Sequence, residues 1–345
     1  MRRFLASSAL VGAALLALPV TAHAAEKDLR TVPLPFLWPR ADLNAVAPDG
    51  AGGVWVGGGQ GAHCLVVLNP WCYNLGNPVV RRWTGSGWKE YPIRGWTGNG
   101  FILQVASGPG GTWLGGVEQG AAGTNRLFVF DGTSFRKVET PSAATIGVLS
   151  TGPAGTWITQ DVAAGSGEPH LLRRDGDAWT DAGLPDPGAR LNDVRALSAT
   201  GVWAAGSRPG AADGERRPAV ARFDGTAWTW LPEPDTPSSN SVDQVVPLAP
   251  DDVWVSSNRH LGHWDGSAWT TIEGPGGAIG DLAVDGSGTL WAATAGGGLS
   301  RYRAGSWQPV AVPGGAELND VAALGASTIW GVGRANDAPV AVSNF

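Results

Sequence analysis

Tryptophan recurs along the chain at seven equivalent places, each preceded by a short apolar run that ends in Val or Leu. The seven residues are Trp55, Trp113, Trp157, Trp203, Trp254, Trp291 and Trp330. Repeats of roughly 40–50 residues are typical of four-stranded β-propeller blades. Each repeat therefore predicts one blade, and the seven repeats together predict one closed ring.

A D-G-x-x-W type element follows in the second half of most repeats. Copies occupy 131–135, 175–179, 224–228 and 265–269, and degenerate copies end at Trp88 and Trp307. Asp-Gly between two apolar runs is a strong hairpin signal, and we expect positive φ at both central residues. The 52 Gly and 25 Pro fit many tight turns, whereas the 18 Trp argue against disorder.

Most of the remaining aromatic residues fall into two further columns of the repeat. The fourth strands carry Trp88, Trp179, Trp228, Trp269 and Trp307, and the third strands end at Trp83, Phe130, Phe223, Trp264 and Tyr302. Columns of this kind stack between neighbouring sheets, where each aromatic side chain buries roughly 150–250 Å². The fold class expected is all-β, a seven-bladed β-propeller of four-stranded antiparallel blades.

The last repeat lacks a fourth strand, and the start of the mature chain resembles one. Residues 340–345 form its third strand, with Phe345 expected in the aromatic column. Residues 29–35 resemble 307–313, and both segments lead to a Leu-Asn pair. We therefore expect the N-terminal strand to pair into the last blade, which hides two open sheet edges. Residues 25–345 then form a single domain.

The N-terminus has the form of an export signal. Arg2 and Arg3 precede an apolar run over 5–20, and Ala22-His23-Ala24 is an A-x-A cleavage site. The run is short for a membrane anchor, so we expect cleavage after Ala24 and a secreted protein, by the Sec or the twin-arginine route. In an oxidising compartment Cys64 and Cys72 are expected to form a disulfide.

A ligand site is expected on the face where second-to-third and fourth-to-first strand connections emerge, here called the top face. Trp38, Trp71 and Trp96 fall outside the repeat columns and lie in such connections, and the longest connection spans 57–78. Aromatic platforms with a few polar groups suit a glycan or an apolar peptide segment. The alternative is a satellite core under the long connection. The candidate residues are Trp38, Arg40, His63, Trp71, Tyr73, Arg94, Trp96, Glu118 and Asn125.

The central channel is a second candidate, because several first strands carry polar residues. Asn44, Asp193, Asp281 and Asp320 are expected to face the channel, the three acids from the same repeat position. Such carboxylates could hold Ca²⁺, with ordered water as the alternative. No other cofactor is expected. The net charge of −6 and the absence of a basic run exclude a nucleic-acid partner.

No catalytic residue is assigned from the sequence. The five histidines include His63, His170 and His260 near top-face connections, but they form no Ser-His-Asp pattern and no metal-ligand spacing. These histidines keep a lyase or hydrolase open as an alternative function.

Several repeats resemble those of known bacterial propellers. Residues 288–291 with 296–302 resemble the regulator-propeller repeat of periplasmic sensors, and 252–255 with 263–269 resemble repeats of secreted actinobacterial proteins. Residues 108–113 are similar to the virginiamycin B lyase propeller. A resemblance of blades implies a fold more firmly than a function. It favours a monomeric extracytoplasmic recognition module for a glycan or protein ligand, with an envelope-assembly partner as a further alternative.

Overall fold

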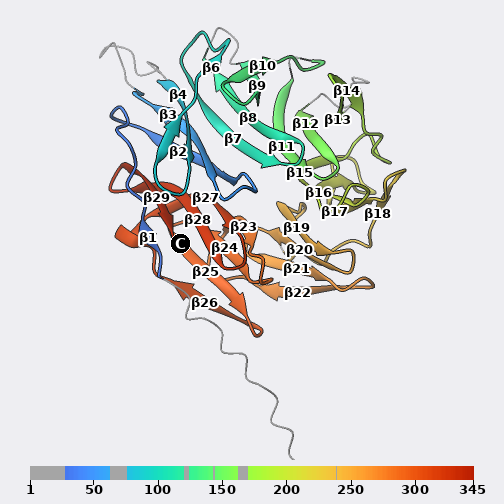
Figure 1. Cartoon of the computed structure of the whole chain (residues 1–345). Helices are drawn as coiled ribbons and strands as arrows, with labels where there is room; N and C mark the ends of the chain where they lie inside the picture. The colour runs from blue at the N-terminus through green and yellow to red at the C-terminus, as the bar shows by residue number, and fades with distance from the viewer. Residues whose placement is uncertain (1–27, 63–75, 120–123, 143, 162–169, 238) are drawn as a thin grey trace, which may run out of the picture.

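The computed structural model describes residues 28–62, 76–119, 124–142, 144–161, 170–237 and 239–345. Within these residues the chain forms seven sheets of mainly antiparallel strands, and each blade has its first strand at the inner edge. Figure 1 shows the seven sheets arranged as blades around a common centre. The prediction of a seven-bladed propeller is therefore confirmed. The export signal, with its cleavage site, and the Cys64–Cys72 pair lie outside the described residues.

The blades follow one another along the chain. Blade 1 contains β2 (Asp42–Pro48), β3 (Val54–Gln60), β4 (Asn77–Trp83) and β5 (Trp88–Glu90). Blade 2 contains β7 (Gly100–Gly108), β8 (Gly111–Glu118), β9 (Thr124–Phe130) and β10 (Phe135–Val138), with β6 (Ile93–Arg94) parallel to β10. Blade 3 contains β11 (Thr145–Gly152), β12 (Gly155–Asp161), β13 (Leu171–Asp175) and β14 (Ala178–Asp181).

The second half of the chain repeats this pattern. Blade 4 contains β15 (Arg190–Ala196), β16 (Val202–Pro209), β17 (Arg216–Phe223) and β18 (Trp228–Trp230). Blade 5 contains β19 (Gln244–Ala249), β20 (Asp252–Ser257), β21 (His260–Trp264) and β22 (Trp269–Glu273). Blade 6 contains β23 (Ile279–Val284), β24 (Leu290–Thr294), β25 (Gly298–Arg303) and β26 (Ser306–Val310). Blade 7 contains β27 (Glu317–Leu324), β28 (Thr328–Ala335) and β29 (Ala338–Ser343), preceded by the short 3-10 helix η1 (Pro313–Gly315).

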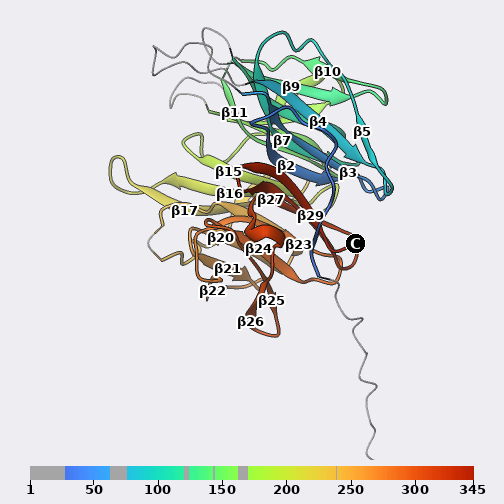
Figure 2. The same cartoon turned by 90° about the vertical axis from the view of Figure 1, so that its left-hand side faces the viewer.

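The N-terminal strand closes the ring. β1 (Arg30–Thr31) pairs antiparallel with β29, and the N–H of Val32 continues the ladder by donating to Ala341 O at 2.8 Å. Figures 1 and 2 show from two directions that this segment runs beside β29. The start of the described chain therefore supplies the fourth strand of blade 7, as the repeat predicted.

The expected position of Phe345 in the third-strand aromatic column is wrong. Trp330 pairs with Ser343, so Asn344 lies next in the register, and its Oδ1 accepts the N–H of Ile329 at 2.8 Å. Phe345 lies one residue further and stacks on Trp330 with a centroid distance of 5.5 Å and an interplanar angle of 7°. Phe345 thus packs on the second-strand Trp of its own blade, whereas column residues such as Phe223 pack on the Trp of the preceding blade.

The first strand of each blade carries a β-bulge, and in blades 1, 2, 4 and 7 a glycine of the partner strand lies opposite the residue before it. In blades 1, 4 and 7 the register shifts after Leu43, Leu191 and Leu318. The glycines opposite these residues lie against backbone, and a Cβ on Gly58 would stand 1.8 Å from Asp42 O. A bulge bends and twists its strand, so these glycines let the inner strands curve around the channel.

The contact between two neighbouring blades is called a seam below, numbered by its blades. The second-strand Trp fills most seams. Trp157, for example, meets Phe223 and Trp228 of the next blade, each at 5.9 Å between ring centroids. Six of the seven second-strand Trp are at most 4% exposed, whereas Trp254 is half-buried and stacks on His263. The core is therefore a ring of sheet-on-sheet contacts, as the aromatic columns predicted.

Fourth-strand Trp residues also tie blades together through their indole N–H groups. Trp88 donates to Pro33 O, Trp179 to Glu139 O, Trp269 to Pro232 O and Trp307 to Glu273 O, all at 2.8–3.2 Å. Each acceptor lies at the end of the fourth strand of the preceding blade or just after it. The repeat thus uses the same side chain for packing and for a hydrogen bond across the seam.

The D-G-x-x-W turns differ from the expected geometry. Gly132, Gly225 and Gly266 have φ between 94° and 99°, but the aspartates before them are absent from the positive-φ residues of the described chain. The Asp side chain shapes the turn instead of a positive φ at that residue. Asp224 Oδ1, for example, accepts the N–H groups of Thr226 and Ala227. The expectation of two positive-φ residues is therefore wrong here, since the carboxylate supplies the acceptor that holds the chain.

Candidate functional site

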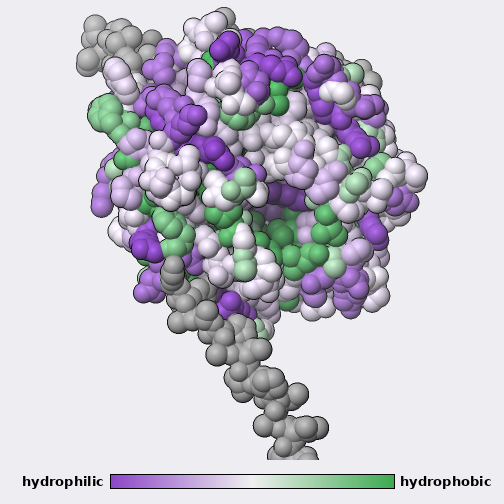
Figure 3. Space-filling model, in the orientation of Figure 1, coloured by the Kyte–Doolittle hydropathy of each residue, from purple (hydrophilic) through white to green (hydrophobic). Residues whose placement is uncertain are grey.

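The inner strands surround a central cavity of about 630 Å³. Figure 3 shows a hollow at the centre of the ring, with hydrophilic colour deep on one side and hydrophobic colour on the other. The predicted channel residues Asn44, Asp193, Asp281 and Asp320 all line this cavity. The polar side chains are therefore distributed unevenly around the channel, and these four come from blades 1, 4, 6 and 7.

Three aspartates at one repeat position join the inner strands across seams. Asp193 Oδ2 accepts the N–H of Val245, Asp281 Oδ2 that of Val321, and Asp320 Oδ2 that of Val46, at 2.7–3.1 Å. Each acceptor lies one blade before its donor. The inner strand is the free edge of its sheet, so its outward N–H groups need acceptors from elsewhere. The carboxylates supply them.

Asparagines at the bulge position make the reciprocal contact. Asn44 Nδ2 donates to Ile102 O, Asn192 Nδ2 to Val242 O and Asn319 Nδ2 to Leu43 O, each at 2.8 Å. Seams 4–5 and 7–1 therefore carry both a carboxylate and an amide contact. Asn44 was predicted as a channel polar group, and the geometry gives all three asparagines a role in holding the ring.

The channel also contains one arginine. Arg195 of β15 lines the cavity, and its Nε lies 3.1 Å from both Oδ1 and Oδ2 of Asp193. The charge of Asp193 raises the pKa of Arg195 above its usual range. At the equivalent position the other six blades have small or medium side chains, Ala47, Ala106, Ser150, Val246, Ala283 and Ala322. Among the described residues that line the channel, Arg195 is thus the one cationic side chain.

Asp281 and Asp320 form an acidic pair on neighbouring blades. Burial, the charge of Asp281 and a hydrogen bond with that carboxyl raise the pKa of Asp320 well above its usual range. Gln244 Nε2 donates to Asp281 Oδ1 at 2.6 Å from the other side. In the described part of the chain, no three or more His, Cys, Asp or Glu side chains are placed to hold a metal ion.

On the top face, the connection from β1 into β2 presents two large apolar side chains. Phe36 is 79% exposed and Trp38 is 62% exposed. The backbone beneath them is fixed, because Trp38 N donates to Gln60 Oε1 at 3.1 Å and Gly61 N donates to Pro39 O at 3.0 Å. Arg40 beside them is exposed and has a positive φ of 56°. This segment, 36–40, is called the aromatic segment below.

Trp96 has a different environment from Trp38. Its ring stacks on Phe128 at 5.5 Å and 27°, and its Nε1 donates to Gly98 O at 2.8 Å. It is half-buried and packs with the apolar cluster between blades 1 and 2. Gly100 and Gly116 give the ring room, since a Cβ on them would stand 2.6 Å and 3.1 Å from it. Trp96 therefore fits the satellite-core alternative.

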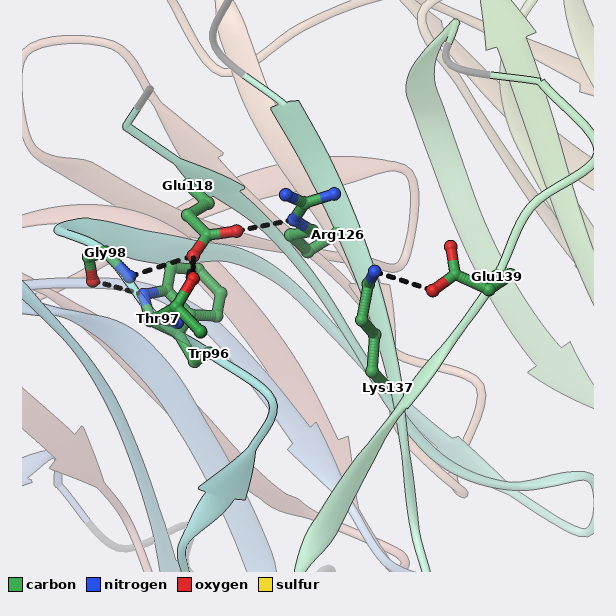
Figure 4. A network of polar contacts seen from close by, with 7 residues as sticks. All are labelled: Trp96, Thr97, Gly98, Glu118, Arg126, Lys137 and Glu139. Carbon is green, nitrogen blue, oxygen red and sulfur yellow. Dashed lines mark hydrogen bonds and ion pairs between the residues drawn. The ribbon is translucent and has the colours of Figure 1, made fainter. Parts of the chain in front are cut away.

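Glu118 anchors the connection that carries Trp96 (Figure 4). Its Oε1 accepts the N–H and hydroxyl of Thr97 and the N–H of Gly98, and its Oε2 contacts Arg126 Nε at 2.5 Å. Burial works to raise the pKa of Glu118, but the hydrogen bonds from Arg126 and Thr97 outweigh it and lower the pKa to about 2. All of these partners come from the protein, so Glu118 holds the loop in place.

The remaining candidates are dispersed. Arg94 is exposed on β6, and Asn125 of β9 lines a separate cavity of about 260 Å³ between blade 2 and the connection to blade 3. His63, Trp71 and Tyr73 lie outside the described residues. Among the described candidates, the structure gathers Trp96 and Glu118 in one network and keeps Trp38 and Arg40 together.

The described histidines do not meet in one place. His170 Nε2 accepts the N–H of Leu191 of the next blade at 2.9 Å, and burial lowers its pKa. His260 lies 3.4 Å from Glu273, and His263 lies 2.9 Å from Asp252. Each therefore serves a local contact, and this part of the chain shows no catalytic arrangement.

Sequence reasoning missed three residues of these sites. Phe36 was not singled out, although an aromatic residue two positions before Trp38 was a usable signal. Arg195 broke the small-residue pattern of its repeat position, which an alignment of the seven repeats could have revealed. The seam contact of His170 had no sequence signal, because its partner is a backbone N–H more than twenty residues away.

Comparison with known proteins supports the fold alone. The chain matches no protein-family model and no curated protein sequence. It is similar in structure to YCF48 from Cyanidioschyzon merolae, with a TM-score of 0.57 and 14% identity over 92% of this chain and 98% of that one. A structure of YCF48 bound to D1 peptide gives a TM-score of 0.61 and 13% identity over 95% and 97%.

An extracellular domain is also similar. The extracellular domain of the putative one component system BT4673 from B. thetaiotaomicron gives a TM-score of 0.62 and 14% identity. The match covers 92% of this chain and 40% of that one. In the described residues no helix has the length and apolar character needed to cross a membrane.

Proposed function

We propose that this chain is an extracytoplasmic recognition module that binds an apolar segment of a protein ligand on its top face. The observation that carries the proposal is the aromatic segment, where Phe36 and Trp38 are 79% and 62% exposed. Exposed aromatic residues on a fixed backbone are typical of binding hot spots, because little order remains to be imposed on binding.

The anchoring of the segment distinguishes it from a loose loop. Two hydrogen bonds tie residues 38–39 to residues 60–61 at the end of β3, so the blade itself positions the rings. Arg40 adds an exposed cation next to them. A rigid apolar pair with one neighbouring charge suits an extended peptide with apolar and acidic side chains.

Two further observations support the proposal. YCF48, which shares the fold, has a structure with a bound D1 peptide, so a propeller of this form accommodates a peptide ligand. The N-terminal Arg-Arg pair, apolar run and A-x-A site support export, and an extracellular domain is among the similar structures. We therefore place the ligand outside the cytoplasm.

The test is to pan a phage library of linear peptides, and in parallel to probe a glycan array, with purified mature protein. We expect peptides with apolar residues to be enriched. Trp38→Ala should weaken their binding by about 1–3 kcal/mol, the cost of losing a hot-spot aromatic, without lowering the melting temperature. Arg217→Ala, an exposed change on blade 4, serves as the control.

Trp96→Ala is the matched aromatic comparison. Because Trp96 packs on Phe128, its loss should destabilise the fold by roughly 3–5 kcal/mol, as for other large-to-small changes in a core. Glycan binding that depends on Trp38, or the absence of any enriched peptide, would overturn the protein-ligand proposal.

A further inference from the structure

The central channel contains an arginine that is paired with Asp193 and, on other blades, an acidic pair. Arg195 of blade 4 projects into the cavity, and the Asp281–Asp320 pair belongs to blades 6 and 7. Among the described residues, no ion pair within 4.0 Å joins Arg195 to Asp281 or Asp320, although both carboxylates act on its charge at longer range. The Arg195–Asp193 pair and the acidic pair are therefore separate polar groups of the channel wall.

Arg195 has a guanidinium edge suited to a carboxylate. Its Nε faces both oxygens of Asp193, which leaves Nη1 and Nη2 without a partner among the described residues. The side chain remains 50% exposed while Asp193 beneath it is 8% exposed. A guanidinium fixed at one edge is preorganised to bind a carboxylate at another through two parallel hydrogen bonds.

The acidic pair has the opposite preference. Asp281 and Asp320 each use Oδ2 on a backbone N–H of the next blade, so both groups are held at the channel wall. Together with Gln244, which bonds Asp281 Oδ1, they present oxygen atoms to the cavity. Acceptor oxygens with net negative charge suit an ammonium group.

Neither a simple anion nor a simple cation matches this channel. An anion on Arg195 meets the negative field of Asp193 and of the acidic pair, and a cation at the acidic pair meets the field of Arg195. A molecule that carries both charges places each next to its opposite. We infer that the channel is a binding site for a small zwitterion of the α-amino acid class, with its carboxylate on Arg195 and its ammonium group on Asp281 and Asp320.

The rest of the cavity favours an apolar side chain on that ligand. Ala47 and Ala106 line the channel at the level of Arg195, and Leu103 is 43% exposed at its wall. The volume of about 630 Å³ lies within the range of small-molecule sites, roughly 300–1,000 Å³. The small residues around Arg195 leave the space that the ligand would fill.

Titration calorimetry with three probes on the mature protein tests the inference independently of the top-face proposal. L-leucine carries both charges, N-acetyl-L-leucine lacks the ammonium group and L-leucinamide lacks the carboxylate. We expect leucine to bind and each derivative to bind about tenfold or more weakly, because each leaves one charged group of the site unpaired. Equal affinity for a derivative, or no leucine binding up to about 10 mM, overturns the inference.

Variants then locate the site. Arg195→Gln should abolish leucine binding, and Arg195→Lys should weaken it because the paired hydrogen bonds are lost. Arg217→Gln, an arginine of the same blade that pairs with Glu215 on the surface, is the matched control and should leave binding unchanged. If Arg195→Gln does not fold, the lysine variant decides, and unchanged affinity in a folded Arg195 variant overturns the inference.

Discussion

Seam 7–1, where the ring closes, and seam 3–4, near the middle of the chain, differ in their balance of polar contacts and apolar packing. At seam 7–1 the inner strands are joined by Asp320 to Val46 N and by Asn319 to Leu43 O. At the outer side, Trp88 donates its indole N–H to Pro33 O. Seam 7–1 therefore has polar contacts at both its inner and its outer edge.

Seam 3–4 relies on apolar packing to a greater extent. Val148 occupies the position of the channel aspartates, and Trp157 packs on Phe223 and Trp228. The Nε1 of Trp228 is buried without an acceptor among the described residues. The polar contact to the inner strand of blade 4 comes from the imidazole of His170.

The two seams also differ in the sequence separation of the segments that they join. Seam 3–4 joins blades that are consecutive in the chain, so the connection keeps them close even if contacts are lost. Seam 7–1 joins segments about 275 residues apart, as in the contact of Asp320 with Val46. Bringing such distant segments together costs more loop-closure entropy, and directional contacts offset part of that cost.

The largest effect is expected from removal of the closing strand. Deleting residues 26–35 removes Leu29 and Val32, which are 8% and 1% exposed, along with the pairing to β29. Burial of two such side chains contributes about 3–6 kcal/mol, so the free energy of unfolding measured in urea should fall by at least that amount. A chain that starts at Glu26 is the control. If the deletion variant melts within about two degrees of this control, the N-terminal strand does not stabilise the ring by closing it.

Second-strand tryptophans compare the packing of the two seams directly. Trp330→Ala and Trp157→Ala should each lower the free energy of unfolding by about 3–5 kcal/mol. The Trp330→Ala variant should lose more stability than the Trp157→Ala variant, because Trp330 contacts Trp83, Trp88 and Phe345. Denaturant unfolding measures both values, and a smaller loss for Trp330 than for Trp157 would show that the closure seam is not the better packed.

Single polar contacts should have smaller effects. Asp320→Ala leaves the N–H of Val46 without its acceptor, which costs about 1–3 kcal/mol when the group stays buried. Asp320→Asn keeps an acceptor oxygen and should cost less. His170→Ala makes the corresponding change at seam 3–4. Urea titrations at neutral pH test the ranking, and an equal loss for both Asp320 variants would contradict the role of the acceptor.

The two seams should respond to pH with opposite sign. Burial lowers the pKa of His170, so the unfolded chain binds more protons near pH 6 and this contribution to stability is lost as pH falls through the ordinary histidine value. The raised pKa of Asp320 makes the folded chain bind more protons above the ordinary aspartate value. Its contribution therefore declines as pH rises from that value toward the folded pKa.

Melting curves across pH test this contrast. Relative to the unmodified protein, His170→Gln should flatten the stability loss near pH 6, and Asp320→Asn should flatten the loss on the rising side of about pH 4. If the pH profiles of melting temperature of both variants run parallel to that of the unmodified chain, the pKa of neither group differs between the folded and unfolded states, and the contrast is wrong.

Much of the fold was predictable because blade formation depends on local patterns. Seven Trp at one repeat position, Asp-Gly turns and a missing fourth strand matched by residues 29–35 were enough to predict the sheets and the closure. The same reasoning misplaced Phe345, since the register of a strand depends on its partner. It also assigned the wrong turn geometry, because the side chain of Asp224 and its equivalents replaced the backbone conformation expected for the pair.

The candidate site was predictable only in part. The sequence alone identified which Trp residues fall outside the repeat and which acids share the inner-strand position. It did not decide that Trp38 is exposed while Trp96 packs on Phe128, because both stand in similar connections and only the neighbouring blade supplies or withholds a packing partner.

The channel shows the same division. The sequence by itself determined that Asp193, Asp281 and Asp320 line the inner strands, since the repeat fixes their place in each blade. Only the tertiary structure decided that each carboxylate accepts an N–H of the next blade and that Arg195 stands opposite an acidic pair. The physical reason is that a repeat specifies one blade at a time, whereas seams and the channel arise from strands of different blades that meet only when the ring is closed.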